Sequence, residues 1–126
     1  MKYWDFNVTN LIADFKKNQR TLAGITEALE YTRRLLQDPL TDKTEGEVKA
    51  YIRMLELREA EYQWYVDMVI LGLNELPEIE RNVLKWWLIE HLDDEYIMLS
   101  LGIPAQQELV RIKNIAITKF HDVVMP

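Results

Sequence analysis

Cysteine is absent from the sequence, and this absence excludes two kinds of architecture. A chain without thiols has neither a disulfide framework nor a zinc site built on thiolates, and it suits a reducing compartment. Apolar runs are also short: none approaches the roughly 20 residues that span a bilayer. The N-terminus lacks the pattern of a signal peptide. We therefore expect a soluble, cytoplasmic protein.

Motifs of catalysis and ligand binding are absent too. The sequence has no nucleophile elbow and no phosphate-binding loop. His91 and His121 have no partner at metal-ligand spacing, and the acids beside His91 fit helix capping better. Glu56, Glu59 and Glu61 do not share a helix face as a catalytic pair would. We expect no enzyme, no metal and no cofactor.

Glycine and proline are scarce, at four each among 126 residues, whereas 48% of the chain is hydrophobic. This composition predicts an all-α protein with an ample core. Two long helices are expected, over residues 9–37 and 45–73, on either side of the loop segment DPLTDKTEG. Along them, positions that are mostly apolar recur in alternating steps of three and four, as in a coiled coil, with Asn18, Thr32 and Glu59 as the polar exceptions. The seam positions are 11, 15, 18, 22, 25, 29, 32 and 36, then 48, 52, 55, 59, 62, 66, 69 and 73.

Two such helices joined by a short loop predict an antiparallel hairpin. We assign residues 1–75 to this hairpin, as a region for oligomerisation or interaction. Its seam should contain Leu22, Ile25, Leu29, Ile52, Leu55 and Tyr62. Asn7 or Thr9 can cap the first helix.

Residues 76–126 follow a different pattern, that of three short helices. The first opens at Leu76-Pro77, and the second runs from about Asp93 to Leu101. Gly102 suits the left-handed residue that ends a helix, and the third helix continues from Pro104 to about Val124. The residues expected to face inward are Ile79, Val83, Leu84, Trp87, Tyr96, Ile97 and Leu101. This layout is typical of a helix-turn-helix, whose second helix enters the major groove of DNA.

The third helix carries a polar stripe opposite its apolar side. Gln107, Arg111, Asn114 and Thr118 recur there at steps of four, three and four, and such side chains suit base edges. Gln106 could also reach a base. Lys113 and Lys119 could hold phosphate. The alternative interpretation is an ordinary solvated helix face.

The C-terminal segment also resembles the promoter-reading fourth region of bacterial sigma factors. The residues that carry the resemblance are Leu76-Pro77-Glu78, Arg81, Val83-Leu84, Glu90, Tyr96, Ile97 and Leu101-Gly102-Ile103. The whole chain looks like small phage regulators of late or packaging genes, the RinA and ArpU type. This resemblance implies a DNA-binding transcriptional regulator, an activator more than a repressor, acting near RNA polymerase.

The net charge of −6 favours other partners. Most DNA-binding domains are basic, because affinity comes largely from phosphate contacts. Two alternatives therefore stay open: an interaction adaptor that binds RNA polymerase or an assembly partner, and the DNA-recognition small subunit of a terminase. The wide apolar arc of the last helix also predicts self-association, as a homodimer or higher oligomer.

Overall fold

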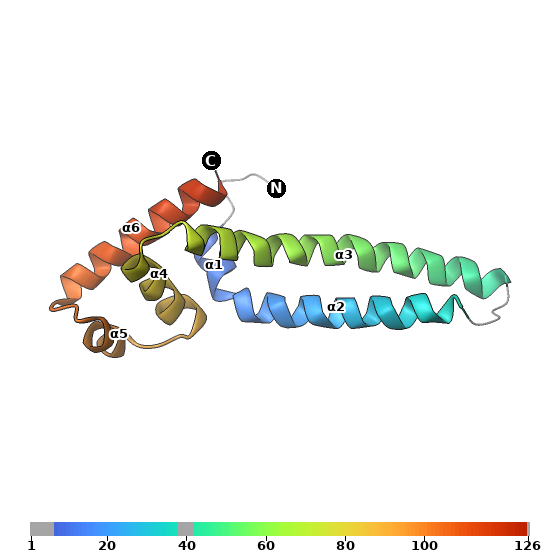
Figure 1. Cartoon of the computed structure of the whole chain (residues 1–126), viewed down its shortest axis with the longest axis horizontal. Coiled ribbons are helices and arrows are strands. Elements are labelled where there is room, and N and C mark those ends of the chain that lie inside the picture. The colour runs from blue at the N-terminus through green and yellow to red at the C-terminus, as the bar shows by residue number, and fades with distance from the viewer. Residues whose placement is uncertain (1–6, 38–41, 126) are drawn as a thin grey trace. The chain divides into compact units, whose positions relative to one another are not determined.

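The computed structural model describes residues 7–37 and 42–125, and every regular element in these ranges is helical (Figure 1). In chain order the elements are α1 (Val8–Ala13), α2 (Phe15–Leu35), α3 (Asp42–Asn74), α4 (Glu78–Leu84), the π-helical η2 (Lys85–Ile89), α5 (Asp94–Leu101) and α6 (Gln106–Val124). The predicted all-α class, with a long antiparallel pair followed by shorter helices, is confirmed. None of the described helices has the length and apolar character needed to cross a membrane.

The first predicted helix is broken, so a single helix over residues 9–37 is wrong. Asn7 caps α1, since its side chain accepts a hydrogen bond of 3.2 Å from the Asn10 N–H. At Asp14 the backbone leaves helical geometry (φ −88°, ψ 7°), and α2 starts at the next residue. The break follows from packing: α1 buries Val8, Leu11 and Ile12 against η2 and α6.

The α2–α3 hairpin has the seam that the three-four spacing predicts. Ile25, Leu29 and Leu55 are buried together, with Ile52 and Tyr62 half-buried against them. Every predicted seam position is buried or half-buried. The Thr26 hydroxyl donates a hydrogen bond of 3.0 Å to Glu59 and fixes which residues lie level across the pair.

The chain forms two compact units, and one of them combines two segments that are separate in the sequence. Residues 17–66 form one unit, which is the main length of the hairpin. The described residues 7–16 and 67–125 form the other. This second unit, called here the C-terminal unit, therefore includes α1 and the end of α3 as well as the segment from residue 76.

Packing in the C-terminal unit changes the expected inward face of α4. Glu80, Val83 and Leu84 are buried, whereas Ile79 is 42% exposed, so its predicted inward position is wrong. Glu80 takes the inner place because its carboxylate meets Lys119 of α6 at 3.0 Å. Ile79 is thereby turned outward, by the roughly 100° that separates neighbouring helical residues.

Tyr96 is the second residue whose predicted inward position is wrong. It is 54% exposed, while its neighbour Ile97 is completely buried. The Tyr96 ring instead lies 6.2 Å from the ring of Trp86, centroid to centroid. Val83, Leu84 and Ile97 are buried, and Trp87 and Leu101 half-buried, on the inner side as expected.

Candidate nucleic-acid interface

The α5–α6 turn is built by two local capping arrangements. Asp93 caps α5, where its carboxylate accepts a hydrogen bond of 2.8 Å from the Tyr96 N–H. Gly102 ends α5 in the left-handed region, at φ 68° and ψ 31°, as predicted. The Ile103 N–H then donates to the Met98 carbonyl at 2.9 Å, which is the closing bond of a Schellman motif. Both ends of the short helix are thus fixed by backbone chemistry.

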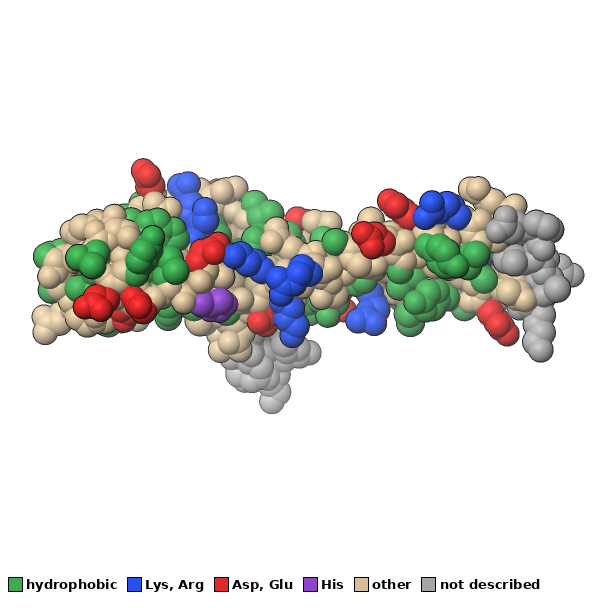
Figure 2. All heavy atoms as spheres, turned by 90° about the horizontal axis from the view of Figure 1, so that it is seen from below, with side chains coloured by type: hydrophobic (Ala, Val, Ile, Leu, Met, Phe, Trp, Pro, Cys, Tyr) green, Lys and Arg blue, Asp and Glu red, His purple; other side chains and the backbone are tan. Residues whose placement is uncertain are grey.

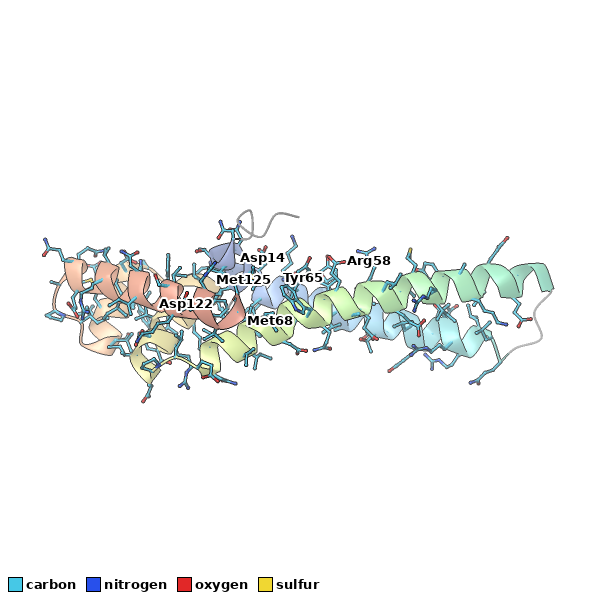
Figure 3. The ribbon with its side chains drawn as sticks, turned by 90° about the horizontal axis from the view of Figure 1, so that it is seen from above. Asp14, Arg58, Tyr65, Met68, Asp122 and Met125 are labelled. Carbon is cyan, nitrogen blue, oxygen red and sulfur yellow. The ribbon has the colours of Figure 1, made fainter. Side chains whose placement is uncertain are left out.

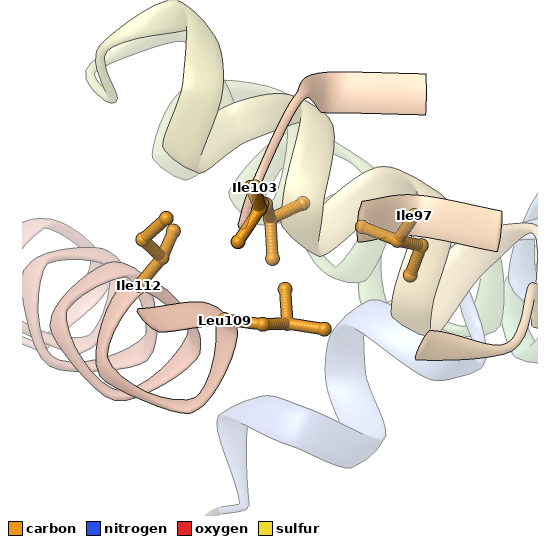
Figure 4. Packing of buried hydrophobic residues seen from close by; sticks show 5 residues of the cluster. Ile97, Ile103, Leu109 and Ile112 are labelled. Carbon is orange, nitrogen blue, oxygen red and sulfur yellow. The ribbon is translucent and has the colours of Figure 1, made fainter. Parts of the chain in front are cut away.

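A small apolar core holds α5 and α6 together (Figure 4). Ile97 and Leu109 are fully buried, and Ile103 fills the turn between them. Val83 of α4 and Ile112 of α6 complete the buried cluster. The turn is therefore rigidly packed, and it fixes the direction in which α6 leaves it. The helix starts at Gln106, two residues later than expected, with Ala105 as its cap residue.

The outward side of α6 carries the predicted polar stripe. Gln107, Arg111, Asn114 and Thr118 are all exposed, whereas the opposite side of the helix is buried. The Thr118 hydroxyl donates to the Asn114 carbonyl at 2.9 Å, so one of its hydrogen bonds is made within the helix. The stripe gives a row of donors and acceptors facing solvent.

Gln106 and Lys113 are occupied by a contact inside the unit. Lys113 Nζ lies 2.7 Å from one carboxylate oxygen of Asp94, and Gln106 Nε2 donates to the other at 2.8 Å. The Lys113 ammonium also sits 4.5 Å from the ring centroid of Trp87, and its side chain is only 13% exposed. Hydrogen bonds from Lys113 and then Gln106 lower the pKa of Asp94. These contacts explain why Lys113 occupies the apolar side of α6.

The other two bases of α6 are also paired with carboxylates. Arg111 forms a two-point ion pair with Glu108, one turn earlier, and this hydrogen bonding raises the pKa of Arg111 and lowers that of Glu108. Lys119 pairs with Glu80 of α4. A groove of about 290 Å³ lies among these charges, with Ile79, Ile112 and Ile115 as its apolar lining.

Glu80 is a functional candidate that the sequence did not reveal. It is 8% exposed, and its carboxylate pairs with the half-exposed Lys119. In the sequence, Glu80 reads as one of two acids in the first turn of α4 and suits the helix dipole there. Only the approach of α6 turns it into a buried counter-ion.

His91 has a backbone role. Its φ of 56° is the left-handed region, which ends η2 and lets the Leu92 N–H donate to the Trp86 carbonyl at 2.9 Å. Within the described ranges there is no group of three or more side chains that could hold a metal ion. Comparison of the chain with protein-family models, with curated proteins and with solved structures gave no match.

Proposed function

We propose that the protein is a sequence-specific DNA-binding regulator of transcription, with α6 as its recognition helix. One observation carries the proposal: an outward row of Gln107, Arg111, Asn114 and Thr118 on the helix that follows a rigidly capped turn. Arginine pairs with guanine and asparagine or glutamine with adenine in the major groove. The resemblance to sigma factors extends the proposal to promoter DNA and to an activator of phage or prophage late or packaging genes, near RNA polymerase.

Different side chains of α6 have different parts in this proposal. Gln107, Arg111 and Asn114 read bases, with Thr118 at the end of the row. Gln106 reaches a base only after releasing Asp94. Lys119 contacts phosphate when it leaves Glu80. Lys113 reaches phosphate only after releasing Asp94, and its present contacts suit it better to holding α5 against α6.

Two substitutions in one ion pair test the proposal with opposite signs. Arg111→Ala removes a base contact and should cost about 1–3 kcal/mol of binding, with a relaxed preference at one base pair. Glu108→Gln removes the carboxylate that competes with DNA for Arg111, and it should tighten binding. Fluorescence anisotropy on DNA from upstream of the protein's own coding sequence, at low salt, measures both.

The matched control is Lys49→Ala, which removes one positive charge from the hairpin and should leave DNA affinity unchanged. Lys119→Ala should weaken binding to all sequences alike and reduce the salt slope by about one. If well-folded protein binds no DNA at tens of micromolar, the proposal fails.

The second candidate is an adaptor that binds a protein, and a specific observation favours it. All three basic side chains of α6 have carboxylate partners in their own chain, which reduces the field available to phosphate. An adaptor predicts that Arg111→Ala and Glu108→Gln leave DNA binding equally absent. The small terminase subunit shares the DNA proposal and differs from it in the DNA bound, packaging sites rather than promoters.

A further inference from the structure

The two long sides of the α2–α3 hairpin differ in polarity. On one side, Arg33 Nη2 pairs with a Glu56 oxygen at 3.2 Å, and Thr26 donates to Glu59 at 3.0 Å. Arg33, Glu56 and Glu59 therefore have partners within the chain on this side. This side is called here the paired face, and it needs no further contact.

The other side of the hairpin, called here the groove face, is apolar and open. A groove of about 360 Å³ runs between α2 and α3, with Ala28, Tyr31, Leu35, Val48 and Tyr51 among its lining. Tyr31 is 61% exposed, Tyr51 48% and Met54 42%. Figure 2 shows hydrophobic side chains gathered along the hairpin toward the connection of α2 and α3, with acidic and basic side chains around them.

The buried core of the hairpin is small. The exposed apolar side chains of the groove face are therefore not an excess beyond a core that is already sufficient for stability. Among the described residues of the hairpin's main length, 17–66, the buried apolar side chains are Ile25, Leu29, Leu55 and Val66. A pair of helices with so few buried side chains is marginal in water, because helices gain most of their stability from packing. Covering the groove face would supply the missing apolar contact.

Charges border the groove face in an alternating order. On α2 they are Arg20, Glu27 and Arg34, and on α3 they are Glu61, Arg58 and Glu47; Figure 3 shows Arg58 and Tyr65 along α3. All six are exposed, and within the described part of the chain none of them forms an ion pair. Glu61 accepts a hydrogen bond of 2.7 Å from the Tyr65 hydroxyl of its own helix, whereas the paired face has an ion pair between α2 and α3.

The order of the charges matches between the two helices with opposite sign. Because Thr26 and Glu59 are hydrogen-bonded, Glu27 lies level with Arg58. By the rise of the helix, Arg20 and Arg34 then lie within about one turn of the levels of Glu61 and Glu47. If the α3 of a second copy packed on α2, opposite charges would therefore face one another at three levels along the helices.

We propose that two copies of this chain dimerise through their groove faces. The two hairpins point the same way, so that α2 of each copy packs beside α3 of the other. Glu27 then meets the partner's Arg58, Arg20 the partner's Glu61 and Arg34 the partner's Glu47. Tyr31, Tyr51 and Met54 fill the interior of the resulting four-helix bundle. This inference does not depend on DNA binding.

The same charges exclude the other two-fold arrangement. If the hairpins pointed in opposite directions, α2 would pack on the partner's α2, and α3 on the partner's α3. Arg20 would face the partner's Arg34, and Glu27 the partner's Glu27. Like charges placed opposite one another oppose association. The charge order thus selects one partner, a second copy, and one direction.

Charge reversal and its compensation test the interface by sedimentation velocity. The full chain should be a dimer at tens of micromolar. Glu27→Arg or Arg58→Glu alone should weaken dimerisation by at least about tenfold, since each places like charges together. The double variant Glu27→Arg with Arg58→Glu should restore it. Glu30→Arg, the same change on an exposed position of α2 away from the groove face, is the matched control.

Two results would overturn the inference. One is a wild-type monomer at these concentrations, which would leave the groove face to another protein. The other is a dimer that Glu27→Arg and Arg58→Glu leave unchanged. Circular dichroism of each variant separates lost association from lost folding, and restoration in the double variant requires a folded chain.

Cross-linking tests the direction of the hairpins. The natural chain has no cysteine, so an introduced thiol is unique. After oxidation, an equal mixture of the Glu27→Cys and Arg58→Cys chains should form mixed disulfide dimers. Glu27→Cys alone should form few. Efficient cross-linking of the Glu27→Cys chain with itself would mean that α2 packs on α2, and would reject the proposed arrangement.

Discussion

Two glycines of α3 have opposite surroundings. A Cβ added at Gly72 would overlap Cε2 of Phe120, whose ring is fully buried. A Cβ added at Gly46 would meet no atom within 4 Å. Gly72 is therefore needed for the close approach of α3 and α6, while Gly46 only adds flexibility to its helix.

Alanine at these two positions should shift stability in opposite directions. Gly46→Ala should stabilise the protein by up to about 1 kcal/mol, since glycine is a poor helix former. Gly72→Ala should destabilise it by about 1–3 kcal/mol, the usual cost of overpacking a core. Urea unfolding of both variants measures the change. A neutral Gly72→Ala would show that the Phe120 ring can move aside.

At the scale of elements, a single carboxylate joins α5 to α6. Asp94, in the first turn of α5, accepts from Gln106 at the start of α6 and from Lys113 two turns later. Its side chain is 37% exposed, so solvent weakens each contact. Asp94 thus adds polar contacts to the apolar core that holds α5 against α6.

The Asp94 contact should be sensitive to acid. Its pKa in the folded protein lies below the ordinary value of 3.8, so it stabilises the fold above that pH. This contribution is lost as the pH falls through the folded-state pKa. We expect Asp94→Asn to be less stable than wild type at pH 6, with the difference vanishing in strong acid. Thermal melts of both proteins, at about six pH values between pH 2 and pH 7, measure this stability difference. A difference that stays constant with pH would contradict the role given to Asp94.

The elements differ in how far their sequence predicts them. The hairpin seam follows from the spacing of Ile25, Leu29 and Leu55, because apolar periodicity predicts which side of a helix is buried when no distant polar partner intervenes. The end of α5 at Gly102 is equally predictable from local sequence, since few residues other than glycine adopt the left-handed conformation. The break at Asp14 and the burial of Glu80 depend on α6, which is distant in sequence. Local patterns contain no record of such partners.

The candidate site also has a part that the sequence predicted and a part that it did not. Spacing was sufficient to find the row of Gln107, Arg111 and Asn114, which is exposed as expected. Spacing did not reveal that Arg111, Lys113 and Lys119 each have a carboxylate partner, two of which come from other helices. The roles of these side chains toward DNA stay predictions until binding is measured.

At the scale of the whole molecule, the C-terminal unit combines segments from both halves of the sequence. A chain of residues 76–126 alone lacks α1 and the end of α3, and so leaves Phe120 and η2 uncovered. We expect it to show no cooperative thermal transition by circular dichroism. Joining residues 7–16 to 67–125 through about six Gly/Ser residues should restore one, because such a linker reaches about 13 Å, whereas neighbouring packed helices lie about 8–10 Å apart. Cooperative melting of residues 76–126 alone would contradict this.

The packing of α1 on η2 and α6 also constrains the order of folding. α1 is synthesised before the other described helices, yet its buried side chains pack on η2 and α6, which are synthesised much later. Contacts between such distant residues close a long loop, and loop closure slows folding. The hairpin, whose contacts are closer in sequence, can form while α1 is still unpaired. Assembly of the α5–α6 turn into its final unit is then the late step of folding.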